Sequence, residues 1–374
     1  MRVRAASLAG AAILLADCGA PGRPGASPSS PTVASAASAL ATEARDRLRE
    51  DALRRARVWR EPVQPIASAD LAANPPGPDA FRKDEEVACT FRLRPSEGWS
   101  PKFECALPSG EEVKVKYGHN SVEAFGEVAA TRLLSALGFG ADRMYVVKAV
   151  RCRGCPAYPY PRYEILDAVR QGGRHEVKFR LAAIERKMPG RPIRGAQAGW
   201  TWPELDRIDP AAGGSTRAEV DALRLMAVFL NHWDNKGPNQ RLVCLDPTDG
   251  AAACAQPFAI LQDVGETFGP RGVDLDGWSG TRIWSDPATC RVDMKTLPYA
   301  GATFGEAQIT EAGRRFLGDL LRQLSHAQIV ALFQGARFPQ YYRQSKRGKD
   351  VENWAAAFED RVRQIVDRPP CPVP

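Results

Sequence analysis

The 374-residue sequence predicts an α+β fold with two lobes: a small β-rich N-terminal lobe that contains one long helix, and a larger helical C-terminal lobe. Three observations predict this fold. Between residues 87 and 117, apolar and polar residues alternate as they do in half-buried strands. A helical repeat follows directly, and helical repeats dominate the chain from Glu219 onward. Eight cysteines lie in these two parts, an even number that predicts disulfides across the fold.

The composition is that of a globular protein with a sizeable core, with 44% apolar and 25% charged residues. The net charge of +7 and the pI near 9.0 indicate attraction to anions in general. The basic residues are scattered, and no aromatic stacking stretch or nucleic-acid-binding motif accompanies them. We therefore expect no nucleic-acid partner.

The N-terminus has the pattern of an export signal. Arg2 and Arg4 precede the apolar run Ala5–Ala16, and Cys18 follows it. Residues 1–18 resemble a bacterial lipoprotein signal peptide, whose cysteine is lipidated after cleavage, although Asp17 departs from the small residue usual before that cysteine. An ordinary cleaved signal peptide is the alternative. The apolar run is too short to span a bilayer. We expect an exported protein of the bacterial cell envelope, anchored to a membrane through Cys18 on the periplasmic side or at the outer membrane.

The chain divides by composition into four further segments. Residues 19–41 are rich in Ala, Gly, Pro and Ser and predict a flexible tether. Residues 42–86 predict a charged helical arm, solvated over residues 43–60, and a proline-rich loop. Residues 87–190 form the expected N-lobe and residues 191–374 the expected C-lobe.

The cysteine positions favour pairs that are close in sequence. Proximity in sequence suggests three pairs: Cys89 with Cys105, Cys152 with Cys155, and Cys244 with Cys254. That leaves Cys290 for the distant Cys371. Eight cysteines allow 105 pairings, so the sequence leaves the connectivity open. A zinc site at Cys152-Arg153-Gly154-Cys155 is disfavoured because no second cysteine pair has ligand spacing.

The periodicity places the individual elements. In the N-lobe we expect strands at 90–93, 103–107 and 113–117, a helix over 122–137, and strands near 144–150 and 177–187. That helix would be capped by Asn120 with Glu123 and would end at Gly138. In the C-lobe we expect helices at 219–230, 310–323, 325–334 and 351–366, the third with Ser325 and Gln328 as a capping box.

Two ordered motifs carry the predicted chemistry. The segment His232-Trp233-Asp234-Asn235-Lys236-Gly237-Pro238-Asn239 has the spacing of a kinase catalytic loop, and Asp263-Val264-Gly265 follows the apolar run 258–261. In this interpretation Asp234 orients or deprotonates an acceptor hydroxyl and Lys236 faces the γ-phosphate. Asn239 and Asp263 hold divalent metal ions, and His232 has a supporting role. The alternative is that Asp234 and Asn239 are turn residues only.

The N-lobe supplies candidate nucleotide-binding residues. A strand lysine should reach the phosphates and pair with a helix glutamate. Lys116 with Glu127 is the preferred pair, with Lys114 and Glu123 as the alternatives. The segment 97–103, which includes Ser100 and Lys102, would cover the phosphates, although no Gly-x-Gly-x-x-Gly occurs in the sequence.

These residues support a resemblance to known proteins. The run Asp263-Val264-Gly265-Glu266-Thr267-Phe268-Gly269 resembles the Asp-x-Gly-x-x-Phe-Gly run of the secretory-pathway casein-kinase-like family. The catalytic-loop spacing is similar to that of HipA-type bacterial kinases and type II phosphoinositide kinases, and residues 127–140 resemble their metal- and nucleotide-coupling helix. The resemblance covers residues 87–335 and implies a two-lobed protein-kinase-like fold and ATP with Mg²⁺ or Mn²⁺. The chain departs from it in the long 239–263 gap, in the phosphate loop, and in lacking a closing motif after Gly269.

The sequence thus predicts an exported kinase-like phosphotransferase that moves the γ-phosphoryl group of ATP to a hydroxyl of a protein, a glycan or a lipid head group. Little ATP is expected outside the bacterial inner membrane, which motivates an alternative: a non-catalytic, pseudokinase-like binding or scaffold lipoprotein. A third hypothesis is that the same site transfers the nucleotidyl group of ATP in place of the γ-phosphoryl group.

Overall fold

The computed structural model describes residues 33–94, 98, 100–159, 175–246, 254–270, 272–294 and 301–372. The chain divides into two units, residues 1–41 and residues 42–374. The predicted signal peptide and Cys18 lie outside the described residues. In the first unit, helix α1 (Val33–Arg54) begins inside the segment expected to be a flexible tether. Its start is rich in alanine, which has the highest helix propensity. None of the helices in the described ranges is both long and apolar enough to cross a membrane.

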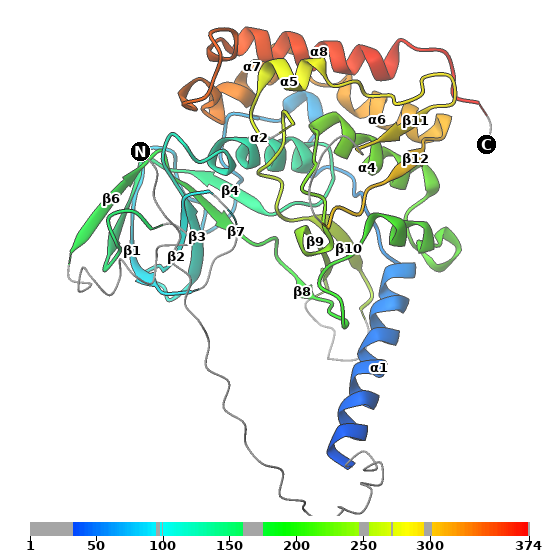
Figure 1. The fold of residues 1–374 in the computed structure, drawn as a ribbon, viewed down its shortest axis with the longest axis horizontal. Helices are drawn as coiled ribbons and strands as arrows, with labels where there is room; N and C mark the ends of the chain where they lie inside the picture. The colour runs from blue at the N-terminus through cyan, green and yellow to red at the C-terminus, as the bar shows by residue number, and fades with distance from the viewer. Residues whose placement is uncertain are drawn as a thin grey trace, which may run out of the picture. The chain divides into compact units, whose positions relative to one another are not determined.

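A seven-stranded sheet forms the N-terminal lobe of the second unit (Figure 1). Its spatial order is β4-β7-β3-β2-β1-β5-β6, and every neighbouring pair is antiparallel except β1 with β5. The strands are β1 (Glu86–Arg92), β2 (Lys102–Ala106), β3 (Glu112–Lys116), β4 (Arg143–Val146), β5 (Ala149–Arg153), β6 (Glu176–Arg180) and β7 (Ala183–Arg186).

Two of the expected long strands are each two strands. The segment expected as one strand near 144–150 divides into β4 and β5, which lie near opposite edges of the sheet. The segment expected over 177–187 divides at Leu181, whose φ of 51° is left-handed and breaks the extended backbone. Alternation alone does not reveal such a break, because the side-chain pattern continues across it.

The N-lobe helix is α2 (Glu123–Ala136), and it ends as predicted with Gly138 in a left-handed conformation, φ 88°. The predicted cap is wrong: α2 begins after Val122, and no side chain caps it. Glu123 is engaged elsewhere, because its carboxylate contacts the ammonium groups of Lys102 and Lys116.

The C-terminal lobe is mainly helical, and Figure 1 shows α2 between its helices and the sheet. Its helices are α4 (Arg217–Leu230), α5 (Leu275–Gly280), α6 (Glu311–Leu321), α7 (His326–Gly335) and α8 (Val351–Val366). Its strands are β8 (Arg191–Pro192), β9 (Gln240–Cys244), β10 (Pro257–Leu261), β11 (Arg291–Asp293) and β12 (Glu306–Gln308). The predicted Ser325 and Gln328 capping box opens α7.

One apolar core runs from α2 through the helical lobe, and its centre is aromatic. Phe268, Trp278, Phe333 and Trp354 pack in mostly edge-to-face or tilted pairs there. Arg361, with no exposed surface, donates hydrogen bonds to the main-chain carbonyls of the last turn of α4 and of α5. This core holds both α4, which leads into the catalytic-loop motif, and α2, which carries Glu123 and Glu127.

The charged arm is not solvated along its length, so that part of the prediction is wrong. Leu53, Ala56 and Val58 are fully buried in the main core. Arg49 is also buried and pairs with Glu204 at 2.8 Å. The charges misled the prediction because they pair across to the C-lobe, while the small apolar residues between them face the core.

All four predicted cysteine pairs are disulfides in the structure: Cys89–Cys105, Cys152–Cys155, Cys244–Cys254 and Cys290–Cys371. The last one ties the end of the chain to the β11 region across 81 residues. The predicted α+β fold, with two lobes stapled by disulfides, is confirmed.

Candidate functional site

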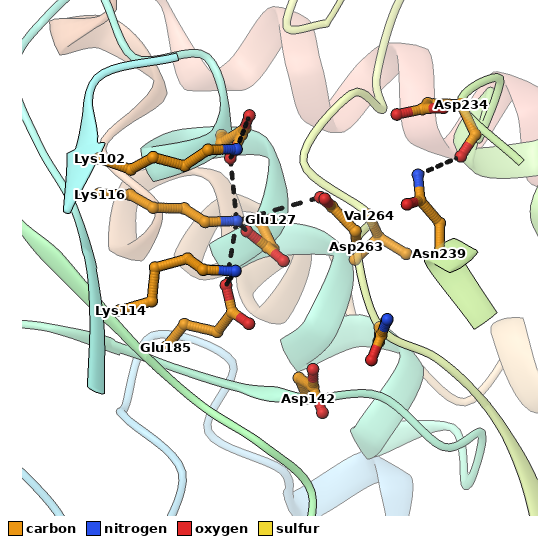
Figure 2. Close-up of polar contacts among 12 residues, drawn as sticks. Lys102, Lys114, Lys116, Glu127, Asp142, Glu185, Asp234, Asn239, Asp263 and Val264 are labelled. Carbon is orange, nitrogen blue, oxygen red and sulfur yellow. Dashed lines mark hydrogen bonds and ion pairs between the residues drawn. The ribbon is translucent and has the colours of Figure 1, made fainter. Parts of the chain in front are cut away.

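The N-lobe candidates meet around Lys116, the last residue of β3. Its side chain is 1% exposed, and its ammonium contacts the carboxylate of Glu127 on α2 (Figure 2). The ammonium also lies 3.0 Å from Glu123 and 3.2 Å from Glu185 on β7. Among the described residues, Lys114, the alternative strand lysine, forms an ion pair with Glu185 alone, at 3.7 Å. The preferred pair is thus brought together, and the alternative glutamate joins it.

Asp263 joins this cluster from the segment after β10. Its carboxylate lies 4.0 Å from the Lys116 ammonium. The close approach depends on two glycines: a Cβ on Gly126 of α2 would lie 2.5 Å from the Gly265 carbonyl, and one on Gly265 would lie 2.6 Å from the Glu123 side chain. The Asp-x-Gly glycine therefore lets the Asp263 segment pack directly on α2.

Three of these carboxylates could hold a metal ion. One oxygen each of Glu123, Glu127 and Asp263 lies within 4.8 Å of the others. The Oε1 atom of Glu127 is buried and has no hydrogen-bond partner among the described residues. Hard divalent cations take such oxygen ligands, so this donor set fits Mg²⁺ or Mn²⁺. The sequence identified Asp263 as a metal ligand, but it did not place the two α2 glutamates in that role.

The charges in the cluster separate the pKa values of its carboxyls. Burial raises the pKa of Glu127 to about 8, against the attraction of Lys116. Burial opposes ionisation of Asp263 as well, but Lys116 and Lys102 outweigh it and hold the pKa of Asp263 at about 2. Asp263 therefore ionises more readily than Glu127 in this cluster.

The catalytic-loop motif begins where α4 ends. Asn231 terminates the helix in a left-handed conformation, φ 54°. The loop then closes on itself, because the Asn239 side-chain amide donates to the Asp234 main-chain carbonyl at 2.6 Å. The Asn239 carbonyl accepts from the Gln262 amide at 3.0 Å. Since β9 and β10 pair Gln240 with Leu261, the residues just outside this pair bring the two motifs side by side (Figure 2).

Asp234 has a free acceptor atom. Its Oδ2 lies 3.2 Å from the Lys236 ammonium, while its Oδ1 is buried without a hydrogen-bond partner in the part of the chain that the structure describes. Burial raises the pKa of Asp234, and Lys236 works against that change. A carboxylate held in this way can accept a hydrogen bond from the hydroxyl group of an acceptor that binds next to it.

Two neighbouring residues support the loop. His232 is fully buried, burial lowers its pKa to about 4, and neither ring nitrogen has a partner among the described residues. It is neutral at pH 7, as a packing residue would be. Asn235 accepts from the Thr303 and Phe304 amides at 2.9 and 2.8 Å and so ties the loop to the segment before β12. The turn-like composition of the motif gave no sign that Asn235 would contact this distant segment.

The predicted phosphate-covering segment is described only in part, because residues 95–97 and 99 lie outside the described residues. Ser100 and Lys102 are both buried. The Lys102 ammonium lies 3.2 Å from Glu123, so it reaches the same cluster as Lys116 but is engaged by α2.

Sequence reasoning missed three acidic residues near these two motifs and the Lys116 cluster. Glu185 of β7 contacts Lys116 and Lys187. Asp142, with no exposed side-chain surface, pairs with Lys187 at 3.0 Å and Arg241 at 2.9 Å. Glu266 has its pKa raised to about 7 by burial and by the charge of Asp234. Glu266 lies inside a quoted motif and was recognisable as a candidate, whereas Glu185 and Asp142 depend on the pairing of β7 with β3 and β4.

Comparisons with known proteins add little to this geometry. No protein-family model matches the sequence, and no curated protein matches it. Among solved structures, the chain is similar to a Helicobacter pylori proinflammatory kinase, CtkA, with 10% sequence identity and a TM-score of 0.43. The match covers 76% of this chain and 96% of that one. At this level of similarity it assigns no property to the chain.

Proposed function

We propose that this chain is a metal-dependent phosphotransferase that moves the γ-phosphoryl group of ATP to a hydroxyl acceptor. The observation that carries the proposal is the convergence of Lys116, Glu127 and Asp263 from three separate elements, beside a loop that presents Asp234 and Asn239. A buried lysine–glutamate pair, a metal-binding carboxylate and an acceptor-facing aspartate are the parts that phosphoryl transfer uses.

Each group has a place in the reaction. Lys116 would hold the α- and β-phosphates, and Lys236, near Asp234, would meet the γ-phosphate. Asp263 with Asn239, and with the α2 glutamates, would hold Mg²⁺ or Mn²⁺, which neutralises phosphate charge when bound. The acceptor oxygen forms a bond to the γ-phosphorus, the bond from that phosphorus to the bridging oxygen breaks, the acceptor proton passes to Asp234, and ADP leaves.

The test follows the fate of the phosphate. Oxidised protein is incubated with ATP, Mn²⁺ and a bacterial envelope fraction, and the products are identified by mass spectrometry. Addition of a phosphate group, absent with Asp234→Asn, supports phosphotransfer. Addition of a whole nucleotidyl group would assign the site to nucleotidyl transfer instead. If the wild-type protein binds nucleotide but neither product is found, a transferase function is contradicted.

One observation favours the non-catalytic alternative. An ammonium group has three N–H donors, and Lys116 already has three carboxylates within 3.2 Å: Glu127, Glu123 and Glu185. A phosphate would have to displace one of them. A pseudokinase-like binding or scaffold protein would keep this network intact, and it predicts no metal-dependent nucleotide binding.

We also propose that the protein is exported and anchored through a lipid on Cys18. The support is the sequence of residues 1–18 alone. Mass spectrometry of the mature N-terminus tests it. The expected result is a mature protein that begins at a diacylated Cys18. An unmodified N-terminus after Cys18 would exclude the lipid anchor and support the alternative of an ordinary cleaved signal peptide.

A further inference from the structure

A cavity of about 330 Å³ lies between α1 and β8 and shares no lining residue with the site described above. Four of its ten lining residues are arginines: Arg45 and Arg55 on α1, and Arg191 and Arg194 in and after β8. Its one lining carboxylate belongs to Asp51. The remaining lining residues are apolar or cysteine: Leu48, Ala52, Pro192, Ile193 and Cys254.

The walls of this arginine cavity are fixed by contacts that need no ligand. Arg55 is clamped between the Asp51 carboxylate, at 2.6 Å, and the Cys254 carbonyl, at 2.8 Å. Cys254 is held in turn by its disulfide to Cys244, which pairs with Arg191 in the sheet of β8 and β9. The cavity is therefore preformed between a helix, a strand and a disulfide.

A second contact holds the far end of the wall. The amide of Ala196, just after β8, donates to the Asp46 carboxylate on α1 at 2.7 Å. This bond fixes the loop that carries Arg194 against the helix that carries Arg45, so the two guanidinium groups line the same cavity from opposite sides.

The positive charge of the cavity is not neutralised internally. Arg45, Arg191 and Arg194 are exposed, and none forms an ion pair with another described residue. Within the described ranges, the hydrogen bond of the Arg45 side chain is to the hydroxyl of Thr42, at 3.1 Å. By contrast, the neighbouring Arg49 on the same helix is buried against Glu204. Three guanidinium charges therefore face a preformed hollow without carboxylate partners.

The basic character continues beyond the cavity. Arg55 also lines an adjoining cavity of about 390 Å³, together with Arg57 and Arg60. Arg60 lies over the ring of Phe258 at 5.9 Å, and no ion pair in the described ranges involves it. Glu61 also lines this second cavity, and Arg57 pairs with Glu219 at 2.6 Å. Beyond the arginine cavity, Arg60 is thus the guanidinium group that adds positive charge without a described ion-pair partner.

We propose that the arginine cavity binds the phosphate group of an anionic lipid headgroup. The guanidinium fork matches phosphate oxygens in a two-point geometry. The apolar floor of Leu48, Ala52 and Ile193 would take the carbon atoms that adjoin the headgroup. Helix α1 is also the first described element after the segment that carries Cys18, the predicted lipid anchor. The proposal concerns membrane contact and does not rest on phosphotransfer.

The test uses the full oxidised chain with Cys18→Ala, so that no lipid on that cysteine contributes. Calorimetry would measure binding of soluble dihexanoyl phosphatidylglycerol, dihexanoyl phosphatidylcholine, inorganic phosphate and a short single-stranded oligonucleotide. The expected order is phosphatidylglycerol tightest, with binding weakened by salt. Arg191→Ala with Arg194→Ala should weaken it about tenfold or more, the size expected for lost charge-assisted hydrogen bonds.

The matched control is Arg322→Ala with Arg363→Ala, which removes the same charge from exposed positions on the helical lobe. This control should bind as the wild type does. Equal binding of phosphate and phosphatidylglycerol would overturn the lipid assignment, and tightest binding of the oligonucleotide would replace it with a nucleic acid. No binding, or equal loss in the control variant, would overturn the site itself. Catalytic activity is not the readout, so a failed phosphotransfer assay leaves this result unaffected.

Discussion

The ammonium of Lys116 on β3 contacts the carboxylate of Glu127 on α2, and both side chains are almost fully excluded from solvent. The pair joins the sheet to the helix that also packs on the C-lobe. Because unpaired charges at this depth are costly, the pair fixes the position of α2 and hence the position of both α2 carboxylates. The candidate metal set of Glu123, Glu127 and Asp263 depends on this relationship.

Replacing Lys116 should weaken nucleotide binding. In Lys116→Met the phosphates lose their buried cation, and we expect affinity for ATP with Mn²⁺ to fall about tenfold or more. Calorimetry measures the effect, with circular dichroism to show that the variant is folded. Lys114→Met is the control, because Lys114 lies on the same strand and its ion pair among the described residues is with Glu185. If Lys116→Met is folded and binds ATP with the affinity of the wild type, the assignment of Lys116 to the nucleotide site is wrong.

Asp234→Asn should separate binding from turnover. The amide keeps the size of the side chain but cannot take the acceptor proton, so we expect turnover to fall by about 10²- to 10⁴-fold. Nucleotide affinity should stay close to that of the wild type, because Asp234 is assigned to the acceptor. Rates of ADP release and direct titration measure the two quantities. Unchanged turnover would leave Asp234 as a turn residue.

Glu266 should make stability depend on pH. Its pKa is raised to about 7 in the folded protein from an ordinary value of 4.5, chiefly by burial. The folded state therefore binds the Glu266 proton more tightly than the unfolded state does. The stability of the fold consequently falls as the pH rises from the ordinary pKa of 4.5 through the folded-state pKa of about 7. The free energy of unfolding of Glu266→Gln, relative to that of the wild type, should therefore rise by about 1–3 kcal/mol between about pH 5 and about pH 8. Urea unfolding at both pH values checks this, and equal changes in the two proteins would contradict it.

The disulfides should differ in their contribution to stability. Cys290–Cys371 closes a long loop, with a sequence separation of 81, and Cys152–Cys155 a short one, with a separation of 3. Loop-closure entropy predicts losses of about 4 kcal/mol and about 2 kcal/mol when each pair is replaced by alanine. Chemical unfolding of the two double variants measures the difference. A larger loss for the short loop would show that packing at Cys152 and Cys155, not chain entropy, dominates.

The sequence predicted much of the fold because its local signals agreed. The α7 capping box and the glycine stop of α2 were readable, since each depends on residues at fixed spacing. The cysteine pairs favoured by proximity are the ones that form, although the sequence alone left the connectivity open. The split at Leu181 and the burial of Leu53 were not readable. Both depend on tertiary contacts that override a continuous local pattern.

The candidate site was predicted in part for the same reason. Asp234 and Asp263 lie in motifs with ordered spacing, and Lys116 was chosen as the lysine of a predicted strand that precedes the N-lobe helix. Glu185 lies in no motif and reaches Lys116 only because β7 pairs with β3, and strand order is not visible in one sequence. Glu123 was identified as an alternative partner, and the structure uses it together with Glu127.

The most direct test of the account is calorimetric titration of ATP with Mn²⁺ into the oxidised wild-type protein and into Asp263→Ala. Asp360→Ala, which removes an exposed carboxylate on α8, is the matched control. The account predicts metal-dependent binding in the wild type and the control, and its loss in Asp263→Ala. Folded wild-type protein that binds no nucleotide, or an Asp263→Ala variant that binds as the wild type does, would contradict it.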